Sequence, residues 1–133
     1  EENLSKLEGY DRVFQLWQLQ DSLGKKDLNT SLEITRSLLE NGIPIPQILI
    51  RLVYLYQQIL WKKMGRSKPI GYTGINKIIT SNLNHYDGSY SHSELIHLLQ
   101  DLRKMDVLSK STPLGEEALL QPLIVKICRD QYV

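Results

Sequence analysis

The sequence predicts an all-helical fold, a single bundle of five to six helices. Leucine and isoleucine recur at spacings of three and four residues through most of the chain, as on the buried face of a helix. Glycine, proline, asparagine and serine stand between these segments, where helices typically begin and end. No segment alternates apolar and polar residues as a half-buried strand does. A chain of 133 residues suits one domain with its own core.

The first two helices are expected to form a hairpin around Gly24. The apolar residues before Gly24 share one helix face, and we expect Gly24 to end this helix in the left-handed conformation of a cap glycine. Asp27 should then accept hydrogen bonds from the first N–H groups of a second helix, which continues to Asn41-Gly42. Because few residues separate the two helices, they should pack antiparallel.

A third helix is expected to lie at the centre of the core. The segment 43–46 has two prolines, so it should be an extended joint in which the residues before the prolines are not helical. Pro46 suits the first helical turn, where its missing N–H costs nothing. The helix should continue to Gly65, and its wide apolar arc predicts burial on most sides.

Three more helices are expected after a connector at 66–74. A short helix at about 75–84 precedes a loop at 85–90. Ser91 and Glu94 match a capping box that opens a fifth helix, and Thr112-Pro113 should open the last one. The inward positions of these two helices are Leu95, Leu98, Leu99, Leu102, Met105 and Leu108, then Leu119, Leu120, Leu123, Ile124 and Ile127.

Composition limits the classes of partner. Sixteen basic and 15 acidic residues give a net charge of +1, which supplies no general attraction to nucleic acid or an anionic membrane. The apolar stretch 43–61 contains proline, glutamine and arginine, so a membrane span is not expected. The single cysteine, Cys128, cannot form an internal disulfide, and we expect a small buried thiol in a cytoplasmic protein.

No pattern of catalytic or ligand-binding residues is present in the sequence. His92 and His97 are five residues apart and His85 is in an expected loop, so the three histidines lack metal-ligand spacing. The carboxylates Asp21, Asp27 and 116–117 lie beside helix ends, where negative charge at a helix start offsets the helix dipole. Residues 71–74 contain two glycines but lack the lysine of a phosphate-binding loop. We therefore expect no catalytic site, metal, cofactor or small-molecule ligand.

A basic segment follows Trp61. It contains Lys62, Lys63, Arg66 and Lys68. These cations could contact phosphates, or they could offset the dipole at a helix C-terminus while their stems cover Trp61. The near-neutral charge of the whole chain favours the second interpretation.

Several short segments follow one another in an order that is more specific than any one of them. They are Val13–Leu16, Asp21–Asp27, Ser37–Gly42 with Pro44 and Pro46, the helix positions Leu52, Tyr56, Gln57 and Leu60, and the series Ser91, Leu95, Leu102, Asp106 and Lys110. Over about residues 10–128 the chain resembles the C-terminal domain of the delta subunit of the bacterial DNA polymerase III clamp loader. It departs from that pattern at 66–88 and at Ser111, where the family often has glycine.

The resemblance implies a non-catalytic collar domain at 10–133, with 1–9 as a linker or the end of a preceding domain. The chain would be a fragment, consistent with its lack of an initiator Met, and would support assembly of the clamp loader that loads the sliding clamp in replication. The parent holoenzyme would be a DNA-directed DNA polymerase. Implied partners are the other loader subunits, with DNA contacted only indirectly or weakly. Asp106 and Lys110 are family-like positions, and they also match an exposed ion pair four residues apart.

Candidate contact residues come from the surplus of large apolar side chains. Tyr54, Leu55, Trp61 and Tyr132 are the candidates for contact with neighbouring subunits, and the alternative is that they complete the core. The competing function is a helical nucleic-acid-binding or regulatory module that uses the basic patch at 62–68.

Overall fold

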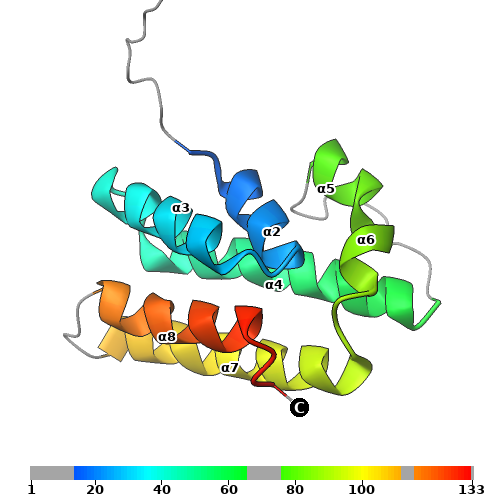
Figure 1. Cartoon of the computed structure of the whole chain (residues 1–133). Helices are drawn as coiled ribbons and strands as arrows, with labels where there is room; N and C mark the ends of the chain where they lie inside the picture. Colours follow the sequence, from blue (N-terminus) through cyan, green and yellow to red (C-terminus); the bar gives the residue numbers. More distant parts are fainter. Residues whose placement is uncertain (1–13, 66–75, 112–115, 133) are drawn as a thin grey trace, which may run out of the picture.

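The computed structural model describes residues 14–65, 76–111 and 116–132. Within these ranges seven helices and no strand form a bundle (Figure 1), which confirms the all-helical fold. The helices are α2 (Leu16–Gly24), α3 (Leu28–Glu40), α4 (Ile45–Lys63), α5 (Lys77–Ser81), α6 (Leu83–Asp87), α7 (His92–Ser111) and α8 (Glu116–Cys128). The expected linker at 1–9, the connector at 66–74 and the helix start at Thr112-Pro113 lie outside the described residues.

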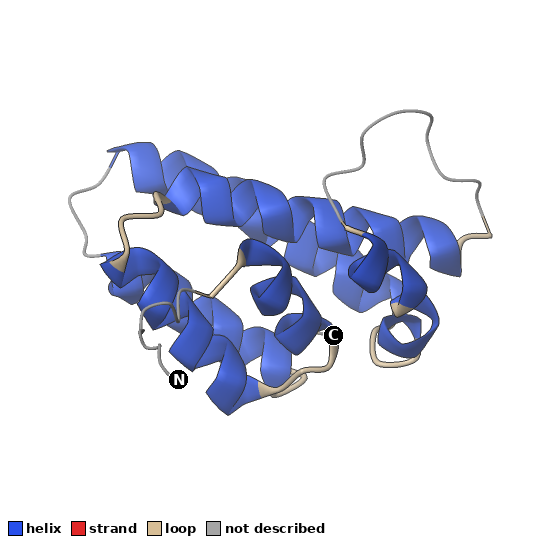
Figure 2. Ribbon diagram, turned by 90° about the horizontal axis from the view of Figure 1, so that it is seen from above, coloured by secondary structure: helices blue, strands red, loops and turns tan. Residues whose placement is uncertain are grey.

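Helix α4 is the centre of the bundle, as the sequence predicts. Helix α2, which forms a hairpin with α3, packs on one side of it, and α7 runs antiparallel to α4 on the other side (Figure 1). Helix α8 packs mainly against α3 and also contacts α7. Figure 2 shows that the described loops join the ends of the helices. The largest fully buried side chains are Tyr56, Tyr86, Leu19, Leu23, Leu38, Ile48, Leu49, Leu52, Leu55, Ile59, Ile79 and Leu95.

Most of the expected helix caps are confirmed. Asp27 Oδ1 accepts a hydrogen bond from the Thr30 N–H at 3.3 Å, and the chain takes a positive φ of 85° at Gly42, just past α3. In the capping box, Ser91 Oγ accepts from the Glu94 N–H at 3.0 Å and Glu94 Oε1 accepts from the Ser91 N–H at 3.1 Å. Helix α4 begins at Ile45, one residue earlier than expected, because Pro46 is accommodated within the first turn.

The cap conformation predicted for Gly24 is wrong. Gly24 is the last residue of α2, and the left-handed conformation belongs to Lys26, with a φ of 57°. A Cβ at residue 24 would lie 2.5 Å from a ring carbon of Tyr86. Glycine is therefore required here by the close approach of a side chain 62 positions away in sequence, and not by backbone conformation.

The segment 76–90 also differs from the expectation of one short helix and a loop. Two five-residue helices, α5 and α6, meet at Asn82, and α6 includes His85 and Tyr86. Tyr86 and Tyr90 are buried core residues. The polar residues around them indicate a loop in the sequence, but the two rings fill the core while their hydroxyls donate to the Asp21 carboxylate and the Leu23 carbonyl.

Helix α7 presents Leu95, Leu98 and Leu102 inward as predicted. Leu108, however, is 42% exposed, which contradicts its assignment to the inner face. After Leu102 the inward stripe continues at Met105, three residues on, and at position 109, seven residues on, so Leu108 is out of phase with Leu102.

Candidate functional site

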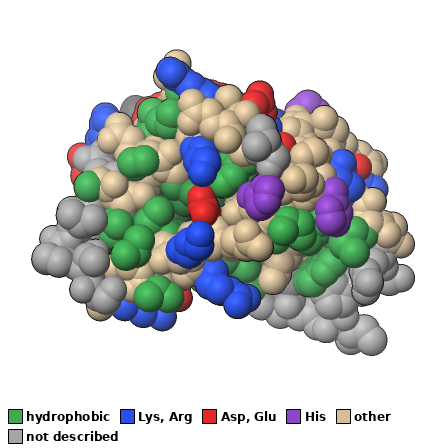
Figure 3. Space-filling view, turned by 90° about the horizontal axis from the view of Figure 1, so that it is seen from below, with side chains coloured by type: hydrophobic (Ala, Val, Ile, Leu, Met, Phe, Trp, Pro, Cys, Tyr) green, Lys and Arg blue, Asp and Glu red, His purple; other side chains and the backbone are tan. Residues whose placement is uncertain are grey.

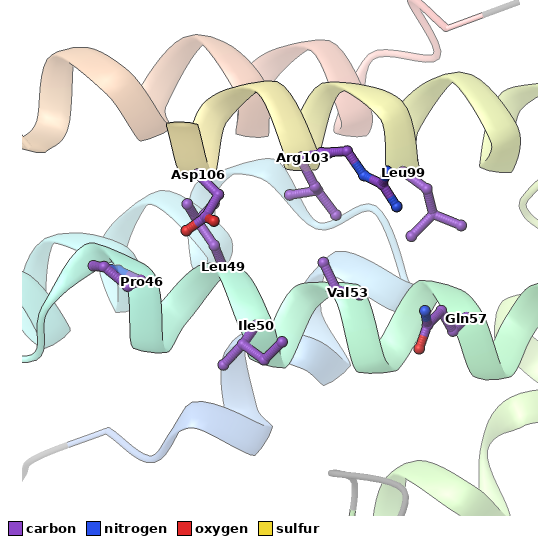
Figure 4. Close-up of a pocket in the computed structure, with 9 residues that line it drawn as sticks. Pro46, Leu49, Ile50, Val53, Gln57, Leu99, Arg103 and Asp106 are labelled. Carbon is purple, nitrogen blue, oxygen red and sulfur yellow. The ribbon is translucent and has the colours of Figure 1, made fainter. Parts of the chain in front are cut away.

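A groove of about 350 Å³ lies between the antiparallel helices α4 and α7 (Figure 4). Its floor is apolar, because Leu49 and Leu102 are nearly fully buried beneath it. Its sides include Ile50, which is 41% exposed. The residues that line the groove are Pro46, Leu49, Ile50, Val53, Gln57, Leu99, Leu102, Arg103 and Asp106.

The spacing of the lining residues explains why the groove forms. On α4, Pro46, Ile50, Val53 and Gln57 follow one another at intervals of four, three and four, so they form one stripe along the helix. Leu99 and Arg103 belong to a matching stripe on α7. The described helices cover neither stripe fully, which leaves an apolar channel open to solvent.

Two opposite charges lie one helical turn apart on the α7 side of the groove. Arg103 is exposed and makes no ion pair with the residues that the structure describes. Asp106 pairs with Lys110 at 3.1 Å, which confirms the expected exposed ion pair on α7. In Figure 4, Ile50 lies between Arg103 and Asp106 along the direction of the helices.

The outer face of α7 extends this surface beyond the groove. A second hollow of about 500 Å³ is lined by Ile96, Leu99, Gln100, Arg103 and Lys104. Figure 3 shows the underside of the molecule, where α7 and α8 lie, and apolar patches there are interrupted by basic, acidic and histidine side chains. This face is therefore mixed in character and not uniformly basic.

A buried polar network joins the turn after α2 to the start of α7. Lys26 Nζ donates to Glu94 Oε2 at 2.7 Å, also pairs with Asp130, and lies 4.4 Å from the centre of the Tyr90 ring. The Tyr56 and Tyr90 hydroxyls are 3.0 Å apart. Burial raises the pKa of both tyrosines, so both hydroxyls stay protonated and hold the core together.

A second network fixes the C-terminal end. The Tyr132 hydroxyl donates to Asp101 Oδ2 at 2.6 Å, and Lys126 Nζ lies 3.4 Å from the same oxygen and 4.3 Å from the centre of the Tyr132 ring. Burial acts to raise the pKa of Asp101, but the hydrogen bond from Tyr132 and the charge of Lys126 outweigh it and lower the pKa below 3.8. These contacts tie the C-terminal segment to α7.

Three buried polar atoms have no hydrogen-bond partner in the described structure. They are Gln20 Oε1, Thr35 Oγ1 and Asp87 Oδ1. The Gln20 side chain is nevertheless anchored, because its Nε2 donates to the Arg51 carbonyl at 2.7 Å. Asp87 Oδ1 lies 2.8 Å from Lys63 Nζ, so its charge is balanced although the geometry is poor for a hydrogen bond. None of the three lines the groove.

The four predicted contact residues do not share one surface. Leu55 is fully buried and Tyr132 is 6% exposed, so both belong to the core. Tyr54 and Trp61 are half-buried on α4. The groove residues Ile50 and Val53 were missed, because an apolar pattern around most of α4 does not indicate which side stays open. Their spacing with Pro46 and Gln57 was the available signal.

The basic segment is only partly described. Lys62 is exposed and Lys63 is half-buried in the last turn of α4, where their charges offset the helix dipole. The ion pair with Asp87 engages Lys63 within the fold. Arg66 and Lys68 lie outside the described residues.

The titratable residues considered for chemistry are dispersed. His85, His92 and His97 are all exposed, and the described part of the chain contains no cluster of three or more potential metal ligands. Cys128 is half-buried, and burial raises the pKa of its thiol to about 11. Asp21 accepts from the Tyr86 hydroxyl at 2.5 Å and pairs with Lys25, which is a structural role. Residues 71–74 are outside the described ranges.

Comparisons with known proteins give no match to a protein-family model, a curated protein or a solved structure. Among the described residues, no helix combines the length and hydrophobicity of a membrane-spanning segment. The clamp-loader resemblance of the sequence motifs therefore stays a prediction.

Proposed function

We propose that this chain is a non-catalytic assembly domain, the collar domain of a delta subunit of the bacterial DNA polymerase III clamp loader. In this role it acts in the cytoplasm, and its helical surface contacts the other loader subunits. The motif order over residues 10–128 supports the family, and the groove between α4 and α7 is the observation that supports assembly.

The groove suits protein contact for a physical reason. The exposure of Ile50 to water beside an apolar floor is unfavourable. Covering this surface with apolar side chains stabilises the complex by about 25 cal/mol per Å² of apolar area buried. Grooves between two helices accept the apolar face of a further helix through residues spaced three and four apart. Helices α4 and α7 are anchored by their buried leucines, so the groove is preformed and its ordering cost is small.

Co-purification with the other loader subunits tests this proposal. The chain should co-elute with them on a sizing column, and Ile50→Asp should weaken that association at least tenfold by placing a charge in an apolar contact. Ile78→Asp is the matched control, because Ile78 is 47% exposed on α5, away from the groove, and should leave association unchanged. A wild-type chain that never co-elutes with loader subunits overturns the proposal.

A DNA-binding measurement separates the collar proposal from the alternative of a nucleic-acid-binding module. Binding that weakens steeply with salt and is lost on Lys62→Glu would support the alternative nucleic-acid-binding function. The collar proposal expects no DNA binding by the chain alone at moderate salt.

A further inference from the structure

We propose that the groove between α4 and α7 binds a second copy of this chain, related by a two-fold axis that passes close to Ile50. This inference goes beyond the proposed function, because it concerns the chain by itself and requires no loader subunit. It rests on the arrangement of charge and apolar surface along the groove.

The charge pattern of α7 is complementary to itself. Arg103 and Asp106 both line the groove, one helical turn apart. When α7 packs antiparallel on α7 of a second copy, with the axis midway between these positions, Arg103 of each copy faces Asp106 of the other. A two-fold interface always produces such reciprocal pairs. The dimer therefore contains two equivalent ion pairs, each between Arg103 of one copy and Asp106 of the other.

Both charges are available for this contact. Arg103 has no ion-pair partner among the described residues, and the side chain of Asp106 is 41% exposed. The pair of Asp106 with Lys110 is an exposed contact four residues apart, which is worth only a few tenths of a kcal/mol. Asp106 can therefore pair with Arg103 of a second copy at little cost in free energy, even if its contact with Lys110 is weakened.

The same axis brings the apolar part of the groove together. Ile50 lies between Arg103 and Asp106 along the helices (Figure 4), so the axis midway between the charges places Ile50 against its own copy. Val53 lies one turn away on the same stripe. The interface then has an apolar centre beside two ion pairs, the usual arrangement of a specific protein contact.

A second copy of this chain suits the charges of this surface better than a purely acidic or a purely basic helix does. An acidic helix would pair with Arg103 but would meet Asp106 with repulsion, and a basic helix would have the opposite problem. The antiparallel copy satisfies both charges at once, and it stacks the α4–α7 pair of one copy on that of the other as a four-helix bundle, a common packing of helices.

The size of the surface is that of a weak interface. Helices α4 and α7 have 19 and 20 residues, so each is about 30 Å long. With axes about 10 Å apart they offer roughly 500 Å² per copy. The total of about 1,000 Å² is at the lower limit for a specific interface, so the dimer should be weak and its fraction should depend on concentration.

Sedimentation equilibrium of the purified chain, from low micromolar to millimolar concentration, tests the proposal. The dimer fraction should rise with concentration. Arg103→Asp and Asp106→Arg should each weaken the dimer at least tenfold, because each puts like charges opposite each other in both pairs. Ile50→Asp should do the same, and Ile78→Asp on α5 should not. Circular dichroism confirms that each variant is folded.

Mixing the two charge variants gives the sharpest result. An Arg103→Asp chain and an Asp106→Arg chain each face repulsion with themselves, but together they form two complementary pairs. Equimolar mixing should therefore restore dimers to near the wild-type level. The double variant R103D/D106R should also dimerise, because both pairs are exchanged.

Three outcomes overturn the inference: a monomer at all concentrations, a dimer that is insensitive to Arg103→Asp, and variants that do not recover on mixing. The test is independent of the loader experiment. A chain that dimerises in this way but never binds loader subunits keeps this inference and overturns the proposed function, and the reverse result does the opposite.

Discussion

Gly24 lies against the ring of Tyr86 so closely that a Cβ on residue 24 would be 2.5 Å from the ring atom Cδ1. The Tyr86 hydroxyl donates to the carboxylate of Asp21, one turn earlier on α2, at 2.5 Å. The tyrosine ring therefore lies along the last turn of α2 and joins α6 to it. Only a residue without a side chain permits this contact.

Replacing Gly24 by alanine should destabilise the domain. Alanine favours a helix over glycine by about 1 kcal/mol, but the added methyl group must displace the Tyr86 ring, and overpacking of a core costs about 1–3 kcal/mol. The difference between this cost and this gain predicts that the free energy of unfolding, measured by urea denaturation, falls by up to about 2 kcal/mol. Gly88→Ala is the control, because the nearest atom to its Cβ is the His85 oxygen at 3.7 Å. A Gly24→Ala variant that is more stable than the wild type contradicts this account.

The ion pair of Lys26 with Glu94 should contribute more than an exposed pair. Glu94→Gln keeps the capping box, since glutamine also accepts at this position, but it removes the charge beside a lysine that is only 10% exposed. We expect a loss of about 2 kcal/mol or more in the free energy of unfolding.

Lys25→Gln provides the comparison for Glu94→Gln. It removes only the pair with Asp21, in which Lys25 is 47% exposed, and should cost about 0.5 kcal/mol or less. Equal losses for the two variants would show that burial of the pair has no effect on its contribution.

Alkaline pH should destabilise the domain. Burial raises the pKa of Tyr56 and Tyr90 above 10, and it raises the pKa of Cys128 from 9.0 to about 11. A group with a raised pKa in the folded state stabilises the fold fully below its unfolded pKa, and this contribution is lost as pH rises. The free energy of unfolding should therefore decline from about pH 9 upward. Urea denaturation at a series of pH values checks the decline, and Cys128→Ala should delay its onset.

Acid should act on Asp101 with the opposite sign. Its pKa is lowered below 3.8, so the contribution of this carboxylate is present at neutral pH and is lost as pH falls through the folded-state value. Asp101→Asn should be less stable than the wild type at neutral pH, and the difference should narrow below about pH 4. Thermal unfolding of both proteins at neutral and acidic pH measures this difference in stability. A difference that stays constant with pH would mean that the ionised carboxylate has no special role.

Leu55 and Ile50 should respond differently to truncation although both are apolar residues of α4. Leu55 is fully buried, so Leu55→Ala should lower the free energy of unfolding by about 2–5 kcal/mol. Ile50 is 41% exposed, and Ile50→Ala should change it by about 0.5 kcal/mol or less at concentrations where the chain is monomeric. Equal effects would contradict the assignment of Ile50 to an open surface.

Local features of this protein were predictable from the amino-acid sequence. The caps at Asp27 and Ser91 are hydrogen bonds between residues three positions apart in the sequence. The turn at Gly42 requires only that this residue takes a positive φ. The periodic spacing of leucines likewise gives the inward face of α7 as far as Leu102. These interactions form between neighbours in sequence, so residue types and spacing are enough to infer them.

The remaining features depend on which elements meet in space. The need for glycine at position 24 comes from Tyr86, and the burial of Tyr90 comes from Tyr56 and Leu23. The position of Ile50 on the surface follows from the placement of α7 along one side of α4 and from the absence of a described element over the groove. An apolar pattern in the sequence indicates that a residue prefers burial. Only long-range packing decides what buries it, or whether that side chain is left for another molecule to cover.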